Sequence, residues 1–346
     1  MTRPYVTIQG KNTVKELKQA AELALPDLQR WDGVVGITLN GGLARGYGDH
    51  LSEIDLTVYL RPETYAVWNS GLSPLTVGIC KINGSLFDLK MVDIRAECQR
   101  AWESMELWDL SYAHILYDPS GEVQQLITAK LARKPSPADA GPRLFAAWWN
   151  YRLAGDTWLH RGDALQGHFM MSQAVQPLLE ALFLINEEYV PHEKWLVHLS
   201  RTLGRRPNDW DRWLDELFDT GDVSLDSLHR RQTTIHKLWQ LLDEWVRQLC
   251  PSPVPAMAAF MYDLLEWLAR EEKLSLSEWE ERAPLSLLTM DPFHKVVIVD
   301  DPWIYLLPDR LLGISEEDMY GWHYTIVKAV RETMLDRRSE GEASLR

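Results

Sequence analysis

One stretch near the N-terminus, residues 36–60, constrains the fold of this chain more than any other. An apolar run ends in the pair Gly41-Gly42, and after a polar spacer a second apolar run begins with Glu53 and Asp55, which are separated by one residue. Side chains on a β-strand alternate between its two faces. The two carboxylates therefore share one face, and the alternating apolar side chains of the second run are free to pack into a core on the other.

The paired carboxylates and the glycines predict a site for phosphate chemistry. Two neighbouring anionic groups such as Glu53 and Asp55 repel each other, and a divalent cation that prefers oxygen ligands, such as Mg²⁺, removes that repulsion. Glycines allow a phosphate chain to approach the backbone closely. A cation site beside a phosphate-binding turn contains the parts needed for phosphoryl or nucleotidyl transfer.

The order of these residues resembles the signature of the DNA polymerase β-type nucleotidyltransferases. That signature has an apolar residue, Gly, then Gly or Ser, a spacer, and two acidic residues one apart with apolar neighbours. The family adds a third carboxylate on a later strand, and here Asp88 lies between Phe87 and Leu89, while Asp93 at the end of the same run is the weaker alternative. The resemblance covers about the first 125 residues well and the helical region that follows more loosely.

The resemblance implies a two-metal mechanism. Glu53, Asp55 and Asp88 would bind two Mg²⁺ ions bridged by the phosphates of ATP, and Asp88 would take the proton of the attacking hydroxyl. The alternative is three exposed strand carboxylates without a shared task. Two residues depart from the usual pattern: Gly42 stands where antibiotic-modifying members often carry serine, and Glu53 stands where aspartate is more usual.

Five further assignments concern the triphosphate. Gly41 and Gly42 would contact it through their backbone, with an ordinary tight turn as the alternative. Ser52 would donate to a phosphate oxygen or else cap a turn, and Arg45 would contact phosphate or else be solvated. Lys194, in the later helical region, is the candidate that closes over the triphosphate, and an ordinary surface charge is its alternative.

The charge and hydropathy of the chain limit the classes of partner that we expect. The formal net charge is −14, and the short basic pairs Arg205-Arg206 and Arg230-Arg231 do not form the basic stripe typical of nucleic-acid binders. An acidic surface suits a small cationic substrate better. No apolar run approaches the roughly 20 residues that cross a bilayer, and the N-terminus lacks a secretory pattern. We therefore expect a soluble cytoplasmic protein without a membrane partner.

Hydrophobic periodicity predicts an α+β chain. In the first part we expect a small twisted mixed sheet, with strands near 33–40, 53–60, 75–80, 85–92 and 112–117 and helices near 12–30, 94–107 and 122–133. A Pro-rich segment, 134–142, follows as a linker. Beyond it the pattern is helical over 143–160, 162–187, 208–218 and 224–249, then over 256–271 and 316–337, with a short apolar run at 295–299. This predicts a catalytic domain at 1–133, a helical bundle at 143–250 that covers the cleft, and a mainly helical extension at 251–346.

Within this family the helical region loosely resembles the C-terminal domains of aminoglycoside and lincosamide nucleotidyltransferases. The expected reaction moves AMP from ATP to a hydroxyl of a small molecule, for example an aminoglycoside-like antibiotic, which would give antibiotic resistance. A toxin or regulator that modifies protein or tRNA, and a non-catalytic nucleotide sensor, are the alternatives. Arg161 and His168 also match the Arg-x6-His spacing of some helical ribonucleases, which is a weak signal. The sequence does not decide the oligomeric state.

Overall fold

The computed structural model describes residues 3–7, 10–250, 264–265, 267–268, 270–271, 273–289, 293–307 and 309–310. The chain forms two compact units. The first, which we call the sheet unit, comprises 1–135 and 187–204, and the second, the helical unit, comprises 136–186 and 205–346. The first boundary lies at the start of the predicted linker. In the described part of the chain, no helix combines the length and apolar character needed to cross a membrane.

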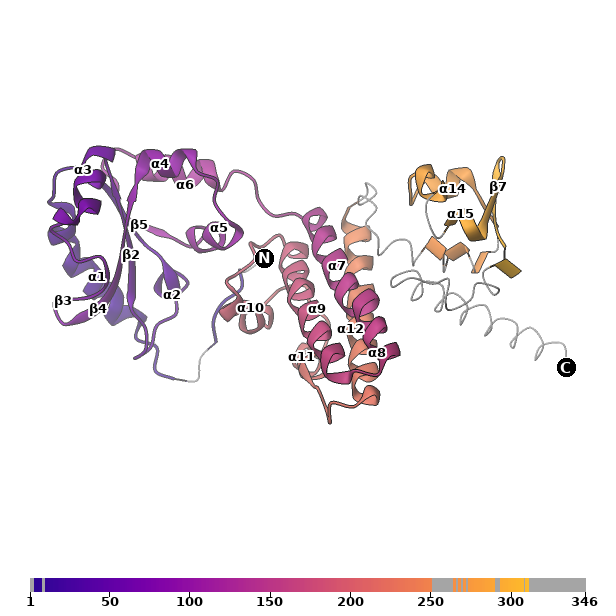
Figure 1. Ribbon diagram of the computed structural model, residues 1–346. Coiled ribbons are helices and arrows are strands. Elements are labelled where there is room, and N and C mark those ends of the chain that lie inside the picture. The colour runs from indigo at the N-terminus through magenta and orange to yellow at the C-terminus, as the bar shows by residue number, and fades with distance from the viewer. Residues whose placement is uncertain are drawn as a thin grey trace. The chain divides into compact units, whose positions relative to one another are not determined.

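The sheet unit contains a five-stranded mixed sheet with the order β3-β4-β2-β1-β5 (Figure 1). Its strands are β1 (Val34–Leu39), β2 (Ile54–Leu60), β3 (Gly78–Ile82), β4 (Ser85–Asp93) and β5 (His114–Tyr117). β2 and β4 are parallel, and the other neighbours are antiparallel. The predicted fold class, a small mixed sheet followed by a helical region, is confirmed.

Side chains alternate along β2, so that one face of the strand packs in a hydrophobic core and the other carries Asp55. Ile54, Leu56 and Val58 are fully buried and belong to a core that includes Ala24 and Leu28 of α1 (Val14–Gln29), so α1 covers this face. The opposite face carries the odd-numbered residues of β2. Helices α4 (Ile94–Gln99) and α6 (Glu122–Lys130) pack with Tyr59 at one end of that face. The end that begins with Asp55 lacks this apolar cover among the described residues.

Three short helices and one later segment complete the sheet unit. They are α2 (Gly41–Ala44), α3 (Pro62–Val67) and α5 (Ser104–Leu110), and α10 (Glu193–Ser200) within 187–204. Arg3 joins that segment to the rest, because its Nη2 lies 3.0 Å from Glu188 and donates to Ser111 Oγ at 2.8 Å. The rings of Trp195 and Tyr47 also form a T-shaped pair, with 5.4 Å between their centroids. Contacts therefore place 187–204 with the sheet.

The helical unit begins with α7 (Gly141–Trp148), α8 (Gly155–Arg161) and α9 (Ala164–Ile185), and continues with α11 (Trp210–Phe218) and α12 (Leu225–Leu249). α9 packs against α7 and α12. Trp148 and Tyr151 are fully buried in this bundle, and the buried Trp239 donates from Nε1 to the Leu144 carbonyl at 2.9 Å. The helices follow the predicted apolar periodicity closely.

Beyond residue 250 the described residues include a three-stranded antiparallel sheet that the sequence analysis did not predict. Its order is β6 (Lys273–Ser275), β8 (Trp303–Leu306), β7 (Val297–Asp300), with α14 (Leu276–Glu280) and α15 (Phe293–Val296) beside it in the chain. The predicted apolar run at 295–299 overlaps β7. The predicted helix at 316–337 lies outside the described residues, as does most of that at 256–271.

Candidate functional site

The glycine turn is built against one carboxylate. β1 ends at Leu39, and Gly41 begins α2 with φ +63°, a left-handed conformation that favours glycine. A Cβ at Gly41 would overlap the carboxylate of Asp55, so the close approach itself requires glycine. Asn40 N donates to the Asp55 carbonyl at 2.9 Å, which ties the turn to β2. The turn and the carboxylate are therefore one local structure.

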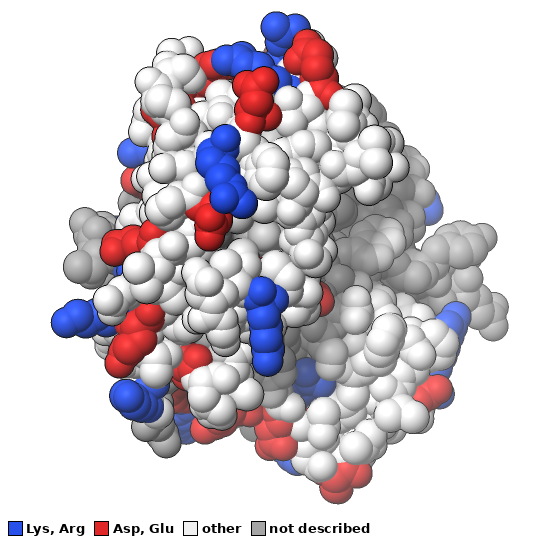
Figure 2. All heavy atoms as spheres, turned by 90° about the vertical axis from the view of Figure 1, so that its left-hand side faces the viewer, with Lys and Arg blue, Asp and Glu red and all other residues white. Residues whose placement is uncertain are grey.

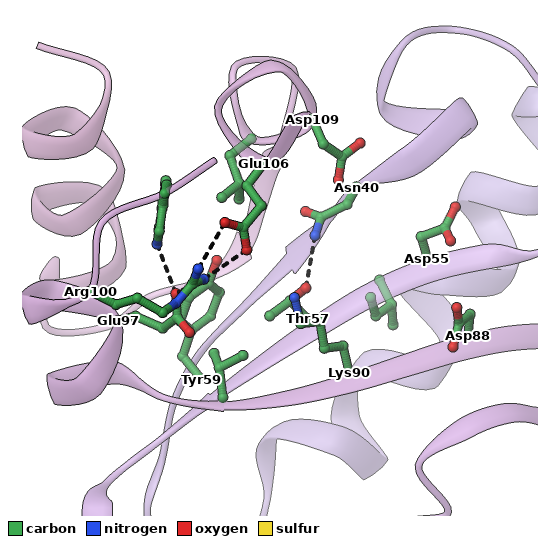
Figure 3. A pocket seen from close by; sticks show the side chains of 14 residues that line it. Asn40, Asp55, Thr57, Tyr59, Asp88, Lys90, Glu97, Arg100, Glu106 and Asp109 are labelled. Carbon is green, nitrogen blue, oxygen red and sulfur yellow. Dashed lines mark hydrogen bonds and ion pairs between the residues drawn. The ribbon is translucent and has the colours of Figure 1, made fainter. Parts of the chain in front are cut away.

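Asp55 and Asp88 are partners in the parallel register of β2 and β4, and both face the same cavity (Figure 3). Glu53 precedes β2. Burial, and then the charges of Glu53, Asp109 and Asp88, raise the pKa of Asp55 from 3.8 to about 6, while the charge of Arg45 opposes this rise. Glu53, Asp88 and Asp109 are therefore close enough to Asp55 to interact with it electrostatically. They form an electrostatically strained group.

The alternative third carboxylate, Asp93, has a different position. It ends β4 and caps α4, because its Oδ1 accepts from Arg95 N at 2.8 Å and from Ala96 N at 3.3 Å. Its register partner on β2 is Leu60 rather than Asp55. Asp88 is therefore the later carboxylate that lies beside Asp55.

A hard divalent cation fits this donor set in its chemistry. The side chains of Asp55 and Asp88 offer oxygen donors, and a bound cation would relieve the repulsion that raises the pKa of Asp55. However, within the residues described here, no three Asp, Glu, His or Cys side chains are arranged as a metal-binding group. The magnesium site of Glu53, Asp55 and Asp88 remains a prediction.

Arg45 is not the solvated arginine of the sequence alternative, because its side chain is only 6% exposed. Its Nη1 lies 2.6 Å from Asp109 Oδ1, and its guanidinium carbon lies 4.2 Å from the centre of the Trp108 ring. Gly41 N donates to the same Asp109 oxygen at 3.2 Å. Asp109, on α5, was missed by sequence reasoning, because no spacing rule relates a helix residue to a turn so far upstream.

Ser52 and Lys194 have simpler surroundings. Ser52 Oγ accepts from Asp49 N at 2.9 Å and donates to Asp49 Oδ1 at 3.2 Å, which is the turn-capping alternative. Lys194 is exposed at the start of α10 and does not line the cavity beside Asp55. Phosphate contact by either residue remains a prediction.

The cavity encloses about 160 Å³ and extends along the open face of β2 and β4. Asp55 and Asp88 lie at one end (Figure 3). At the other, Arg100 Nη2 bridges Glu97 at 2.7 Å and Glu106 at 2.8 Å. This second cluster gave no sequence signal, because its residues come from α4, from α5 and from the loop between them.

Two polar side chains line the middle of the cavity. Asn40 donates from Nδ2 to Thr57 Oγ1 at 2.8 Å, while its buried Oδ1 lacks a hydrogen-bond partner in the described chain. Lys90, two residues after Asp88 on β4, is exposed at the cavity (Figure 3). The site therefore offers a ligand both an acceptor and a cation between its two acidic ends.

One face of the molecule carries charges of both signs (Figure 2). On the face that Figure 2 shows, Lys and Arg side chains are interspersed with Asp and Glu, and the described residues there form no continuous basic stripe. This mixture does not favour a long polynucleotide ligand.

Comparison with known proteins gives limited matches. A family model described as "Domain of unknown function (DUF4037)" matches residues 100–196. No curated protein matches the chain. A solved structure described as a nucleotidyltransferase-like protein from Exiguobacterium sibiricum 255-15 is 14% identical, with a TM-score of 0.41, over 79% of this chain and 86% of that chain. Neither match assigns an activity to this chain.

Proposed function

We propose that this protein is a nucleotidyltransferase that moves AMP from ATP to a hydroxyl of a small molecule and releases pyrophosphate. The observation that carries the proposal is the glycine turn built against Asp55, which lies in register with Asp88. A turn that admits a phosphate chain beside paired carboxylates suits in-line transfer of a phosphoryl group. ATP is the donor that the family resemblance implies.

Each residue has a defined task in this proposal. The backbone N–H groups of Gly41 and Gly42 orient the triphosphate. Glu53, Asp55 and Asp88 would hold magnesium, which supplies positive charge against the charge that develops on the phosphoryl oxygens when it is bound. Asp88 accepts the proton of the attacking hydroxyl, since its carboxylate lies beside Asp55 and faces the cavity.

A small cationic acceptor is the substrate class we favour. The cavity contains the carboxylates of Asp88, Glu97, Glu106 and Asp109, and the formal net charge of the chain is −14. The acidic side chains outnumber the lining cations Lys90 and Arg100, so the cavity attracts a protonated amine. An aminoglycoside-like antibiotic is one example of this class. At about 160 Å³ the cavity would hold only the reacting part of such a molecule.

The proposal is tested by transfer of labelled AMP and release of pyrophosphate with Mg²⁺, ATP and a panel of hydroxyl acceptors that includes aminoglycosides and lincosamides. We expect Asp88→Asn to lower the rate roughly 100-fold or more, which is the usual loss for a general base. Asp93→Asn is the matched control, because that carboxylate caps α4 instead of lining the cavity. Undiminished transfer by Asp88→Asn would refute the assigned chemistry.

A further inference from the structure

The carboxylate of Asp109 accepts hydrogen bonds from two donors that the sequence analysis assigned to phosphate, Gly41 N–H and Arg45. We call the Gly41 N–H and the Arg45 guanidinium the cradle. Both donors bond the same atom, Asp109 Oδ1, at 3.2 Å and 2.6 Å. A phosphate oxygen bound by these donors would need the position that this carboxylate oxygen holds.

The cradle is an anion site by its own chemistry and not only by its place at a helix start. The Arg45 side chain is 94% buried (6% exposed), and its Nε has no hydrogen-bond partner in the part of the chain that the structure describes. A buried guanidinium without a counter-ion is strongly destabilised, so it will pair with whichever anion reaches it. Charge-assisted bonds from arginine to carboxylate and to phosphate have similar geometry. Asp109 and a phosphate are therefore competitors for one position.

The Asp109 side chain is less enclosed than the Arg45 side chain that it contacts. Asp109 lies in the last turn of α5, and 32% of its side chain is exposed at the cavity, whereas Arg45 is enclosed beside Trp108. Rotation of one side chain is therefore enough to release the cradle. Asp109 also adds negative charge near Asp55, which opposes the approach of any polyphosphate.

We infer that Asp109 is a specificity-determining residue that takes the place of phosphate in the cradle, so that a phosphate ligand binds only by displacing it. The inference rests on the proposed function in assigning the cradle to phosphate. The inference predicts that removing this carboxylate increases the affinity for phosphate. Removal of a carboxylate that helps to build a binding site weakens binding, but removal of Asp109 will strengthen phosphate binding, because the competitor and its charge are lost together.

The test is calorimetric titration of the full-length protein with tripolyphosphate and with ATP, at one fixed Mg²⁺ concentration. The variants are Asp109→Asn, which keeps the shape of the side chain, and Asp109→Ala, which empties the position. Glu103→Gln is the matched control, because it removes one negative charge from the N-cap of the same helix without lining the cavity. Thermal melting of each variant, with and without tripolyphosphate, gives a second readout that does not depend on activity.

We expect both Asp109 variants to bind tripolyphosphate at least about tenfold more tightly than the native chain, which is about 1.4 kcal/mol. Glu103→Gln should stay within about twofold. Tripolyphosphate should also raise the melting temperature more in Asp109→Ala than in the native chain, since it restores a counter-ion to Arg45. Equal or weaker binding by the Asp109 variants, or an equal gain in Glu103→Gln, would overturn the inference.

The titration also separates this inference from the proposed function. If the native chain binds ATP and transfers AMP while the Asp109 variants gain nothing, only the role of Asp109 is wrong. A different outcome is that the Asp109 variants bind tripolyphosphate more tightly while neither they nor the native chain prefers ATP to tripolyphosphate or releases pyrophosphate. That result would support the role of Asp109 and refute nucleotidyl transfer. Absence of binding by every protein to both ligands would refute both.

Discussion

Replacing Asp55 with Asn should make the metal-free protein more stable while it abolishes ATP binding. Burial, and then the charges of Glu53, Asp109 and Asp88, raise the pKa of Asp55 from 3.8 to about 6 in the folded chain. A rise of about two pKa units corresponds to about 3 kcal/mol of unfavourable ionisation, at 1.36 kcal/mol per unit. The neutral amide of Asn has nearly the same shape and carries no charge.

The raised pKa of Asp55 determines at which pH values the folded protein loses stability. Because the folded-state pKa is raised, the stability linked to Asp55 is present below the unfolded pKa of 3.8 and is lost as the pH rises through about 6. At pH 8 the folded protein therefore carries the whole penalty, and Asp55→Asn should raise the free energy of unfolding by about 2–3 kcal/mol. Near pH 4 the two proteins should differ little, because the folded native chain is protonated at this residue.

The assay is urea unfolding of EDTA-treated protein at pH 8 and pH 4, read at the amides of β2 by pulsed hydrogen exchange so that only the sheet unit is scored. Asp32→Asn, an exposed aspartate in the same unit, is the control and should change the free energy by less than about 0.5 kcal/mol. A native chain that is more stable than Asp55→Asn at pH 8, or a gain that is equal at both pH values, would refute the electrostatic account. A more stable but inactive variant is the expected signature of strain kept for function.

Three further predictions follow from local geometry. Gly41→Ala should lower the free energy of unfolding by about 1–2 kcal/mol, because Gly41 has a left-handed backbone, and should lower ATP affinity at least tenfold, because the new Cβ displaces Asp55. Gly42→Ala is the control and should have smaller effects in urea unfolding and ATP titration. Equal effects of the two variants would contradict the role assigned to Gly41. Burial, and then Arg152, lower the pKa of His236 from 6.5 to about 4, so the folded state favours the neutral ring and the helical unit should lose about 3 kcal/mol as the pH falls from 6.5 to about 4. His236→Gln should flatten that pH dependence in urea unfolding, and an unchanged slope would contradict the assignment. Arg3→Ala should speed hydrogen exchange within 187–204, because it removes the bonds to that segment and to 111; unaltered exchange would show that other contacts hold it.

The face of β2 that carries Asp55 could be predicted from the sequence because the signals there are local. A period of two places Glu53 and Asp55 on the face opposite the apolar residues, and the structure buries those apolar residues as expected. Asp88 needed the family resemblance, since alternation does not reveal which strands are neighbours. The parallel register of β2 and β4 then explains why that resemblance selected Asp88 instead of Asp93.

The remaining parts of the site depend on tertiary packing, which local patterns do not encode. Asp109 reaches the turn because α5 packs near it, and Arg45 is buried by that same contact. Asn40 precedes the glycine pair, but only the structure shows that its Oδ1 is buried at the cavity. The strands β6, β7 and β8 have three or four residues each, too few for a period of two to be distinguished from chance.

The central claim is tested most directly by calorimetric titration of ATP, with and without Mg²⁺, into the native chain and into Glu53→Ala/Asp55→Ala. We predict binding that requires Mg²⁺ and is lost in the double variant. Binding of equal strength in both proteins would contradict a cation site at these carboxylates. The absence of binding by the native chain to any nucleoside triphosphate would contradict nucleotidyl transfer itself.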